Sequence, residues 1–304
     1  MAREFERRQP QPPLTLPTLG KVLGNFVEQD EDSKAQEILP TPEKLTTKQR
    51  LKEKLKRKFF HRKQIIVEKI VEGLGIFGAP DIRVGGKENL EKALELTKGK
   101  NLAFVMNHTS NFDTPALERS LKKIGFGEIV PKLIYLQGIK LDKNPVAKIF
   151  LGGFNRIRVW PPNLPAENET EKIERKKMTR ESLESAKRAL GEGYFLGIYC
   201  EGGRSYNGKL KEVEPAAIHY LTMQPDTIVI PVAIRETDKV LPRGSFIIFP
   251  AAPVNVNFGE PIIISFLLQE YQNLPNDEKH KKIGDFIMGK IAKQLPEEYR
   301  GVYV

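Results

Sequence analysis

The chain has 304 residues, of which 39% are hydrophobic, and this is enough for one large core or for a core with a small helical annex. Its 49 lysines and arginines outnumber 39 acids, and the net charge of +10 suits an anionic partner such as nucleic acid, an acidic bilayer surface or a phosphorylated substrate. The single cysteine excludes an intrachain disulfide and a cysteine-based metal cluster, and no apolar run approaches the roughly 18 residues of a membrane-spanning helix.

The first 80 residues differ in composition from the rest. Residues 1–43 are rich in proline, glutamine and acids and lack periodicity, which predicts a mostly disordered arm. Over residues 44–77 apolar residues recur at helical spacing, and Lys48–Lys63 holds nine basic residues against one acid, Glu53. Such a basic amphipathic helix suits an anionic membrane surface, and packing of its apolar stripe on the main domain is an equal alternative. We therefore divide the chain into this arm, a basic amphipathic helical segment over residues 44–80, and a domain over residues 81–304.

The start of the chain is charged and lacks the apolar centre of a secretory signal. Together with the single cysteine, this predicts a reducing compartment. We therefore expect a cytoplasmic protein that is peripherally associated with the cytoplasmic face of the membrane.

From residue 81 onward, short apolar segments alternate with helical patterns, which predicts an α/β domain with a mixed sheet flanked by helices. The expected strands are residues 101–106, 133–136, 156–160, 194–199, 227–234, 245–249 and 254–257. The expected helices are residues 114–124, 145–151, 169–190, 215–223 and 276–295.

The segment Asn107–Asp113 follows directly on the buried strand 101–106 and precedes a helix, so it stands where α/β sheets bind ligands. His108 and Asp113 are five residues apart across this turn, close enough for the carboxylate to bond one ring nitrogen and leave the other free as a base. The pair can remove a proton from a hydroxyl, and no Gly-x-Ser-x-Gly elbow supplies a serine nucleophile. The alternative is a helix-capping aspartate near an unrelated histidine, because so short a spacing is common.

A second polar segment, Cys200–Ser205, opens from the strand 194–199. Gly202 and Gly203 let the backbone approach a ligand, and Arg204 offers a planar fork for phosphate. Glu201 can fix that fork or accept hydrogen bonds from substrate hydroxyls. A surface ion pair at a strand-to-loop turn is the alternative interpretation.

A third segment begins with a glycine pair at residues 152 and 153 and leads into a strand that carries Arg156 and Arg158. Alternate positions place both guanidinium groups on one face of this strand. A substrate phosphate or Glu201 is a candidate partner for them, and a solvated strand edge is the alternative.

Four motifs follow one another along the chain: Asn-His-x4-Asp at 107–113, Gly-Gly-Phe-x3-Arg at 152–158, Glu-Gly-Gly-Arg-Ser at 201–205, and an apolar strand ending in Pro231. As an ordered set they resemble the motifs of the glycerol-3-phosphate and 1-acylglycerol-3-phosphate (lysophosphatidate) acyltransferase superfamily. The resemblance runs from about residue 85 to residue 303. The segments Val254–Ile262 and Leu295–Tyr303 also resemble the usual ending of its members.

The resemblance implies that His108 is the general base on the acceptor hydroxyl and that Asp113 orients it. It further implies an acyl donor that is a thioester on coenzyme A or acyl carrier protein, with no metal and no other cofactor. Pro231 would shape the acyl or acceptor pocket. The implied substrate-binding residues are Arg156, Arg158, Glu201, Gly202, Gly203, Arg204, Ser205 and Pro231.

The acceptor stays open between glycerol-3-phosphate and 1-acylglycerol-3-phosphate. The segment 201–205 resembles members that use the first, whereas the short chain and its ending resemble members that use the second. The expected partners are an anionic membrane surface, the thioester carrier and the glycerol-phosphate acceptor, with no nucleic acid. Two alternatives remain: a basic nucleic-acid-binding α/β protein without catalytic activity, and a non-catalytic lipid-surface protein, against which the His-Asp pair argues.

Overall fold

The computed structural model describes residues 81–98, 101–140, 154–162, 164–243 and 253–304. The predicted arm and basic amphipathic segment, the glycine pair at 152–153, the helix at 145–151 and the strand at 245–249 lie outside the described residues and stay predictions. Within the described ranges, no helix is both long enough and apolar enough to cross a membrane.

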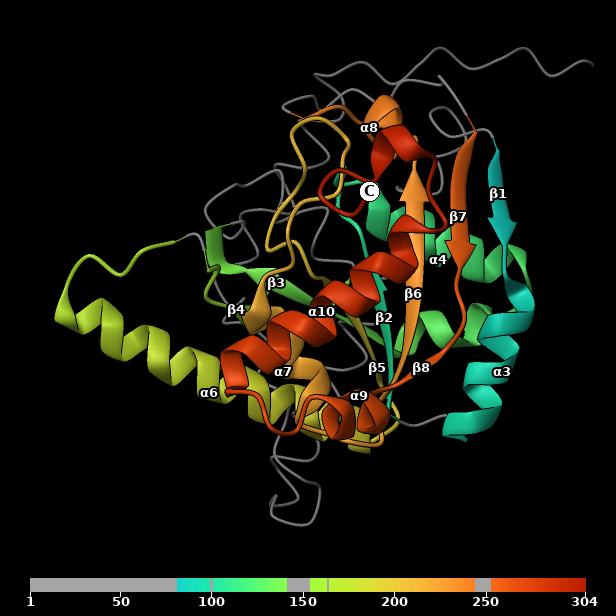
Figure 1. The fold of residues 1–304 in the computed structure, drawn as a ribbon. Helices are drawn as coiled ribbons and strands as arrows, with labels where there is room; N and C mark the ends of the chain where they lie inside the picture. Colours follow the sequence, from blue (N-terminus) through green and yellow to red (C-terminus); the bar gives the residue numbers. More distant parts are fainter. Residues whose placement is uncertain (1–80, 99–100, 141–153, 163, 244–252) are drawn as a thin grey trace, which may run out of the picture. The chain divides into compact units, whose positions relative to one another are not determined.

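Strands and helices alternate along the described chain (Figure 1). The strands are β1 (Ile82–Gly85), β2 (Leu102–Met106), β3 (Leu133–Gly138), β4 (Asn155–Val159), β5 (Phe195–Tyr199), β6 (Ile228–Arg235), β7 (Val254–Phe258) and β8 (Ile262–Ile263). The helices are α3 (Lys87–Thr97), α4 (Asp113–Lys123), α6 (Glu169–Gly191), α7 (Pro215–Thr222), α8 (Thr237–Val240), α9 (Ile264–Glu270) and α10 (Asn276–Ala292), with 3-10 turns η2 (Gly127–Lys132) and η4 (Glu297–Tyr299).

Ordinary start signals begin two of the helices, α6 and α7. The Asn168 side chain accepts a hydrogen bond from the Glu171 N–H at 2.9 Å and so caps α6. Helix α7 begins with Pro215, whose missing N–H would have had no partner in the first turn. These boundaries agree with the sequence predictions to within about two residues.

The described strands form one eight-stranded mixed sheet, in the order β1-β7-β6-β2-β5-β3-β4 with β8 beside β6. Strands β6, β2, β5, β3 and β4 are parallel, whereas β7 and β8 run antiparallel to β6, and β1 is parallel to β7. The mixed sheet flanked by helices confirms the predicted fold class.

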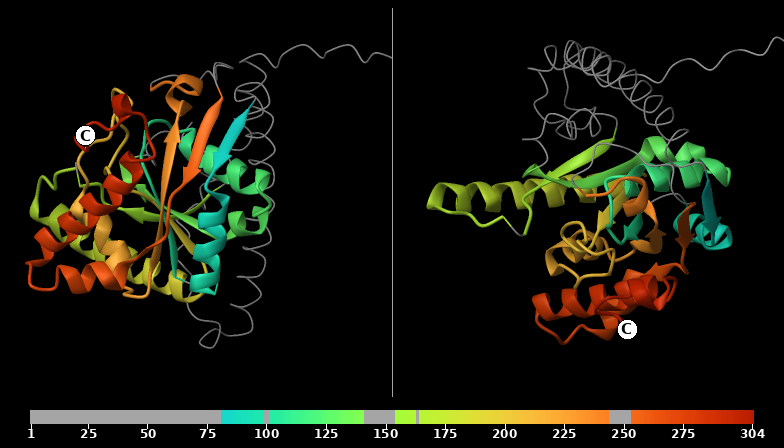
Figure 2. Two further views of the ribbon diagram at one scale, coloured as in Figure 1. Left: turned by 45° about the vertical axis from the view of Figure 1, so that its right-hand side comes forward. Right: turned by 90° about the horizontal axis from the view of Figure 1, so that it is seen from above.

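Helices cover both faces of the sheet (Figures 1 and 2). Residues of α6, α7, α9 and α10 pack with Ala103 and Val105 of β2 on one face, and residues of α3 and α4 pack with Phe104 and Met106 on the other. All four of these β2 side chains are fully buried. Because neither face meets water, β2, β5 and β6 are nearly continuous apolar runs without alternation.

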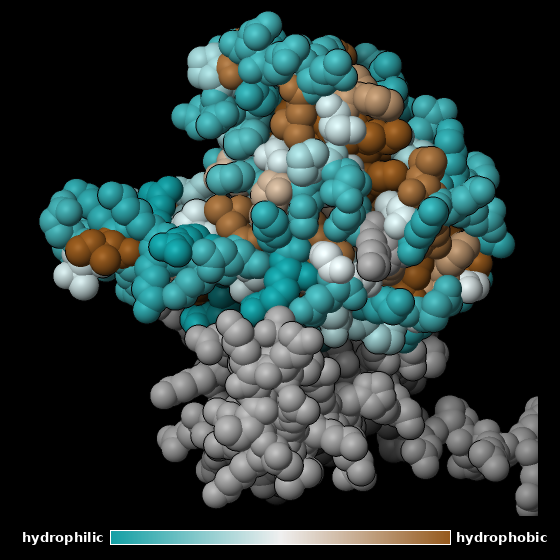
Figure 3. Space-filling view, turned by 90° about the horizontal axis from the view of Figure 1, so that it is seen from below, coloured by the Kyte–Doolittle hydropathy of each residue, from teal (hydrophilic) through white to brown (hydrophobic). Residues whose placement is uncertain are grey.

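Seen from the side where β6 begins, the surface is mostly hydrophilic, with hydrophobic residues in separate patches (Figure 3). The exposed hydrophobic residues of the described helices include Leu96 of α3 and Phe266 of α9. Buried polar residues, among them Asn107, Asp113 and Glu201, gather at the opposite edge, where the parallel strands end.

Some elements were not expected from the sequence. The strand β1 has only four residues, too few to show a hydrophobic period. Helix α9 follows β8 without any intervening polar residue, so the sequence does not mark where the strand ends and the helix begins. One position also needs correction: Pro231 lies in the middle of β6 and does not end an apolar strand.

Pro231 is tolerated in the middle of β6 because the antiparallel partners of β6 change there. Strand β8 pairs with residues 228–229, and β7 pairs with residues 232–235, so the missing N–H falls between the two ladders. The Pro231 carbonyl points to the same side and accepts the Gly259 N–H at 2.8 Å.

Candidate active site

The loops that follow β2, β5 and β6 meet at one edge of the sheet, because β2 lies between the other two strands and runs parallel to both. The first residue after β2, Asn107, is buried and bridges to β6. Its side chain donates to the Ile234 carbonyl at 2.7 Å and accepts from the Ile234 N–H at 2.8 Å. Asn107 therefore extends the pairing of β2 with β6 by one residue and holds the start of the His108 loop.

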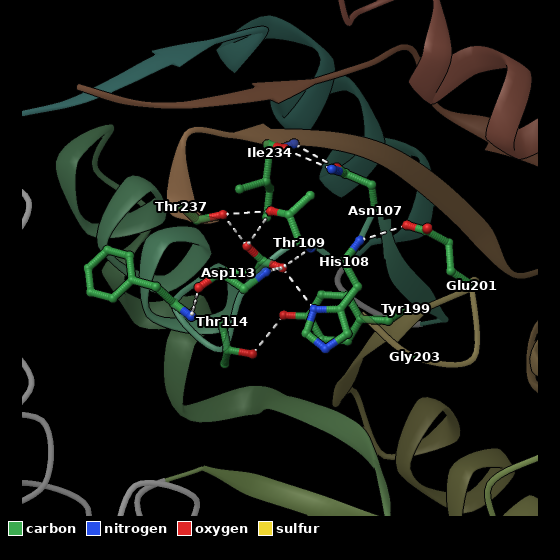
Figure 4. A network of polar contacts seen from close by, with 12 residues as sticks. Asn107, His108, Thr109, Asp113, Thr114, Tyr199, Glu201, Gly203, Ile234 and Thr237 are labelled. Atoms are coloured by element: carbon green, nitrogen blue, oxygen red, sulfur yellow. Dashed lines mark hydrogen bonds and ion pairs between the residues drawn. The ribbon is translucent and has the colours of Figure 1, made fainter. Parts of the chain in front are cut away.

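The Asp113 carboxylate is fully buried and receives five hydrogen bonds from the residues around it (Figure 4). Its Oδ2 atom accepts from the Thr109 N–H at 2.8 Å, from the Ser110 N–H at 3.0 Å and from His108 Nδ1 at 2.8 Å. Its Oδ1 atom accepts from the hydroxyl of Thr109 at 3.3 Å and from that of Thr237. Five donors around one carboxylate offset the cost of burying it and fix both of its oxygens.

The His108 ring is held on two sides and open on a third. Its Nδ1 atom binds Asp113, and its ring stacks on Tyr199 at a centroid distance of 4.0 Å and an interplanar angle of 23°. The Nε2 atom points away from Asp113 (Figure 4) and has no hydrogen-bond partner among the described residues. The side chain is 18% exposed, so a substrate hydroxyl can reach Nε2.

Tyr199 ends β5, and its hydroxyl forms a hydrogen bond of 2.7 Å with the Thr114 hydroxyl. Burial and, second, the charge of Asp113 raise the pKa of Tyr199 well above its usual value, so the phenol stays neutral. A neutral aromatic face against the imidazole stabilises the charged form that appears when His108 takes a proton. Tyr199 therefore positions His108 and favours its role as a base.

The loop after β5 also holds the backbone of His108. Glu201 is buried, and its Oε1 atom accepts the His108 N–H at 2.8 Å while its Oε2 atom accepts the Lys211 N–H at 2.9 Å. The His108 carbonyl in turn accepts the Ser205 N–H at 2.7 Å. Both backbone polar groups of His108 are thus bound by residues 201–205. The structure places Glu201 behind His108, and its contact with substrate hydroxyls stays a prediction.

Burial raises the pKa of Glu201 to about 7, although the N–H groups of Lys211 and His108 act in the opposite direction. The folded chain therefore binds more protons than the unfolded chain between about pH 4.5 and pH 7, and stability falls as the pH rises through this window. The slope reaches at most about 1.4 kcal/mol per pH unit. We expect Glu201→Gln to remove this slope, as measured by urea unfolding at pH 5, 6, 7 and 8.

The matched control for that measurement is Glu174→Gln, which changes an exposed glutamate of α6. We expect the control to follow the wild-type dependence on pH. Parallel curves for the wild type and Glu201→Gln would contradict the assignment of this titration to Glu201.

The glycines of the β5 loop act through the backbone. Gly202 has φ = 64°, and a Cβ atom there would lie 3.2 Å from Pro162 Cγ, so a larger residue would be strained. The Gly203 carbonyl accepts a hydrogen bond from Lys211 Nζ at 2.9 Å, which brings an ammonium group to the loop. Ser205 is buried and its hydroxyl bonds within the loop, so its side chain serves the shape of the turn.

Arg204 lies between Gly203 and Ser205 and is half-buried. Burial lowers the pKa of its guanidinium, and the charge of Asp113 acts in the opposite direction. The Ser205 N–H, one residue along, binds the His108 carbonyl. Arg204 is therefore a partly desolvated cation close to the His108 loop, and its predicted contact with a substrate phosphate stays a prediction.

The register of the sheet relates Arg156 and Arg158 to the same site. Arg156 pairs with Tyr135 and Arg158 with Gln137, and Tyr135 belongs to the core on the α3 and α4 side. Registered partners in a parallel sheet share a face, so both arginines lie on that side. When the pairing of β3 with β5 is continued by two residues, Arg158 is level with Tyr199, two strands away. The spacing of the strands gives about 10 Å between the Cα atoms of Arg158 and Tyr199. Arg156 donates to the Gln137 side chain at 3.2 Å, and Arg158 lies nearer than Arg156 to the carboxyl end of β4.

The structure does not bring Pro231 into this cluster. Its contacts are with Gly259 and Gln294, and its side chain lies on the face opposite to Met106, with Val229 and Ala233. Its role in shaping the acyl or acceptor pocket stays a prediction.

Three residues that sequence reasoning missed complete the site. Thr109 and Tyr199 are adjacent to predicted motifs, and a polar or aromatic residue at a strand end is the available signal. Thr237 is the first residue of α8, which follows β6, and no pattern links it to Asp113, which lies 124 residues away in sequence. In the described parts of the chain, no three His, Cys, Asp or Glu side chains come together to hold a metal ion.

Comparisons with family models and with solved structures both find matches to the chain. A family model described as acyltransferase matches residues 81–235, about half of the chain. This part holds all of the site residues described above except Thr237. No curated protein matches the chain. Among solved structures, the chain is similar to the 1-acyl-sn-glycerophosphate (LPA) acyltransferase PlsC from Thermotoga maritima, with 19% identity and a TM-score of 0.49 over 88% of this chain and 85% of that chain.

Proposed function

The chain belongs to the acyltransferase family, and from this premise we propose that it moves a fatty acyl group from a thioester to a hydroxyl of glycerol-3-phosphate or 1-acylglycerol-3-phosphate. The thioester is carried by coenzyme A or by acyl carrier protein. The observation that carries the proposal is the His108 ring, bound through Nδ1 to Asp113 with Nε2 open at the sheet edge.

The reaction needs one base and no protein nucleophile. His108 Nε2 takes the proton of the acceptor hydroxyl as its oxygen attacks the thioester carbonyl. A carbon–oxygen bond forms, the carbon–sulfur bond breaks, and the departing thiolate takes the proton from His108. Asp113 keeps Nδ1 protonated throughout, and the Tyr199 ring supports the transient imidazolium.

Positive charge beside His108 supports an acceptor that carries phosphate. The Lys211 ammonium lies on the Gly203 carbonyl, and the half-buried Arg204 follows in the chain. The two nearest acids, Asp113 and Glu201, are both occupied by donors of the chain itself. The local excess of positive charge therefore remains available to an anion.

The alternative of a basic nucleic-acid-binding protein rests on net charge alone. Family membership and the occupied carboxylate behind His108 both favour an enzyme. Tight, salt-sensitive binding of DNA or RNA that survived the loss of His108 would support the alternative.

The acceptor and donor can be identified with a panel of substrates and the full chain. We expect acyl transfer from palmitoyl-coenzyme A or palmitoyl-acyl carrier protein to glycerol-3-phosphate or 1-acylglycerol-3-phosphate, identified by the mass of the product. Glycerol is the matched control, because it keeps the hydroxyls and lacks the phosphate, and we expect its kcat/KM to be lower by about 100-fold or more. No product with either phosphate, or equal rates with glycerol, would overturn the proposal.

A further inference from the structure

One arginine close to the site belongs to none of the predicted motifs. Arg243 follows α8, and its guanidinium carbon lies 3.6 Å from the centre of the Tyr206 ring. Tyr206 is 80% exposed and comes two residues after Arg204. A large aromatic ring in water, with a guanidinium stacked on it, holds that cation in one place.

Backbone contacts bring the two arginines to the same loop. The Ser205 N–H binds the His108 carbonyl at 2.7 Å, which anchors Arg204. The Ser110 hydroxyl donates to the Leu241 carbonyl at 2.7 Å, which anchors the segment that carries Arg243. Both guanidinium groups therefore extend from points fixed on residues 108–110.

Arg204 and Arg243 are also close enough to affect each other. Burial and, second, the positive charge of Arg243 lower the pKa of Arg204. In the described part of the chain, neither arginine forms an ion pair with a carboxylate. Two like charges side by side, with a third cation at Lys211, favour an anion between them.

We propose that Arg243, held on the Tyr206 ring, is a second guanidinium for the acceptor phosphate and makes the site select a phosphate monoester over a phosphate diester. This inference rests on the proposed function and assigns a residue to the recognition of its acceptor phosphate. A monoester carries up to two negative charges and three terminal oxygens near neutral pH, enough for two planar forks. A diester carries one charge and two free oxygens, so one of the two guanidinium groups would be left without a full partner.

The test compares 1-acylglycerol-3-phosphate with 1-acylglycerophosphoglycerol, which has the same acyl chain and hydroxyl but a diester phosphate. In Arg243→Gln we expect KM for the monoester to rise about 10- to 100-fold, because a hydrogen-bonded charge pair is lost, with kcat within about threefold. KM for the diester is expected to change less than about threefold. Lys209→Gln is the matched control, since it removes an exposed cation from the same loop, and we expect it to leave both acceptors unaffected.

A second variant tests the role of the ring. Tyr206→Leu is expected to raise KM for the monoester about two- to fivefold in the wild-type background. In the Arg243→Gln background, Tyr206→Leu is expected to cause no further rise in KM, because the ring acts through Arg243. Independent effects of the two substitutions would contradict this coupling.

An equal rise in KM for both acceptors in Arg243→Gln, or no rise in KM for the monoester, would overturn the proposed selectivity. Failure of the proposed function is a separate result, seen as absence of acyl transfer by the wild type. In that case, calorimetric binding of glycerol-3-phosphate and glycerophosphoglycerol to the full chain still tests the inference. Binding of the monoester that is tighter than that of the diester and falls in Arg243→Gln supports it, and equal binding overturns it.

Discussion

Replacement of His108 by alanine is expected to lower kcat for acyl transfer about 10²- to 10⁴-fold, with little change in the free energy of unfolding. The loss follows from removing the group that takes the proton of the acceptor hydroxyl. The fold tolerates the change because the backbone of His108 keeps its bonds to Glu201 and Ser205. The side chain itself makes one hydrogen bond, to Asp113.

The matched control is His219→Ala, which removes an exposed histidine of α7. It should retain kcat, because His219 stacks on His280 and makes no contact with the site residues. Urea unfolding of both variants at one pH separates loss of chemistry from loss of fold. Near-wild-type turnover in a folded His108→Ala protein would rule out His108 as the base.

The fold follows from local patterns more completely than the site does. Continuous apolar strands and the helices between them are visible in the sequence, because a sheet buried on both faces leaves a strong signal in β2, β5 and β6. The predicted contact of His108 with Asp113 is confirmed at 2.8 Å, since five residues across a strand-to-helix turn leave few geometries. Catalysis by this pair stays a prediction until it is measured.

Partners from distant loops could not be predicted in the same way. Thr237 reaches Asp113 because β6 pairs with β2, and Arg243 reaches Tyr206 because the loops after β5 and β6 end at one edge. Both contacts depend on strand order, which a single sequence does not reveal. Glu201 shows the same limit: its charge suggested a substrate contact, whereas its two oxygens bind backbone N–H groups of the chain.

The five donors around Asp113 make its substitution the most informative in the molecule. In Asp113→Asn, the amide oxygen can take the place of Oδ2 and keep the bonds from Thr109 and Ser110. The NH₂ group then replaces Oδ1 and faces the hydroxyls of Thr109 and Thr237, which can rotate to accept. We therefore expect a folded protein that is less stable by about 1–3 kcal/mol.

Its kcat is nevertheless expected to fall about 10²- to 10⁴-fold, because a neutral amide does not stabilise the imidazolium form of His108. In Asp113→Ala the two buried N–H groups lose their acceptor as well, so urea unfolding should show a larger loss of stability than in Asp113→Asn. Asp113 acts through His108, so adding Asp113→Asn to His108→Ala should lower kcat by less than about tenfold further. If the losses of kcat in the two single variants multiplied in the double variant, Asp113 would act on the substrate directly. That result would contradict the structure, in which the Asp113 carboxylate is fully buried behind the imidazole of His108.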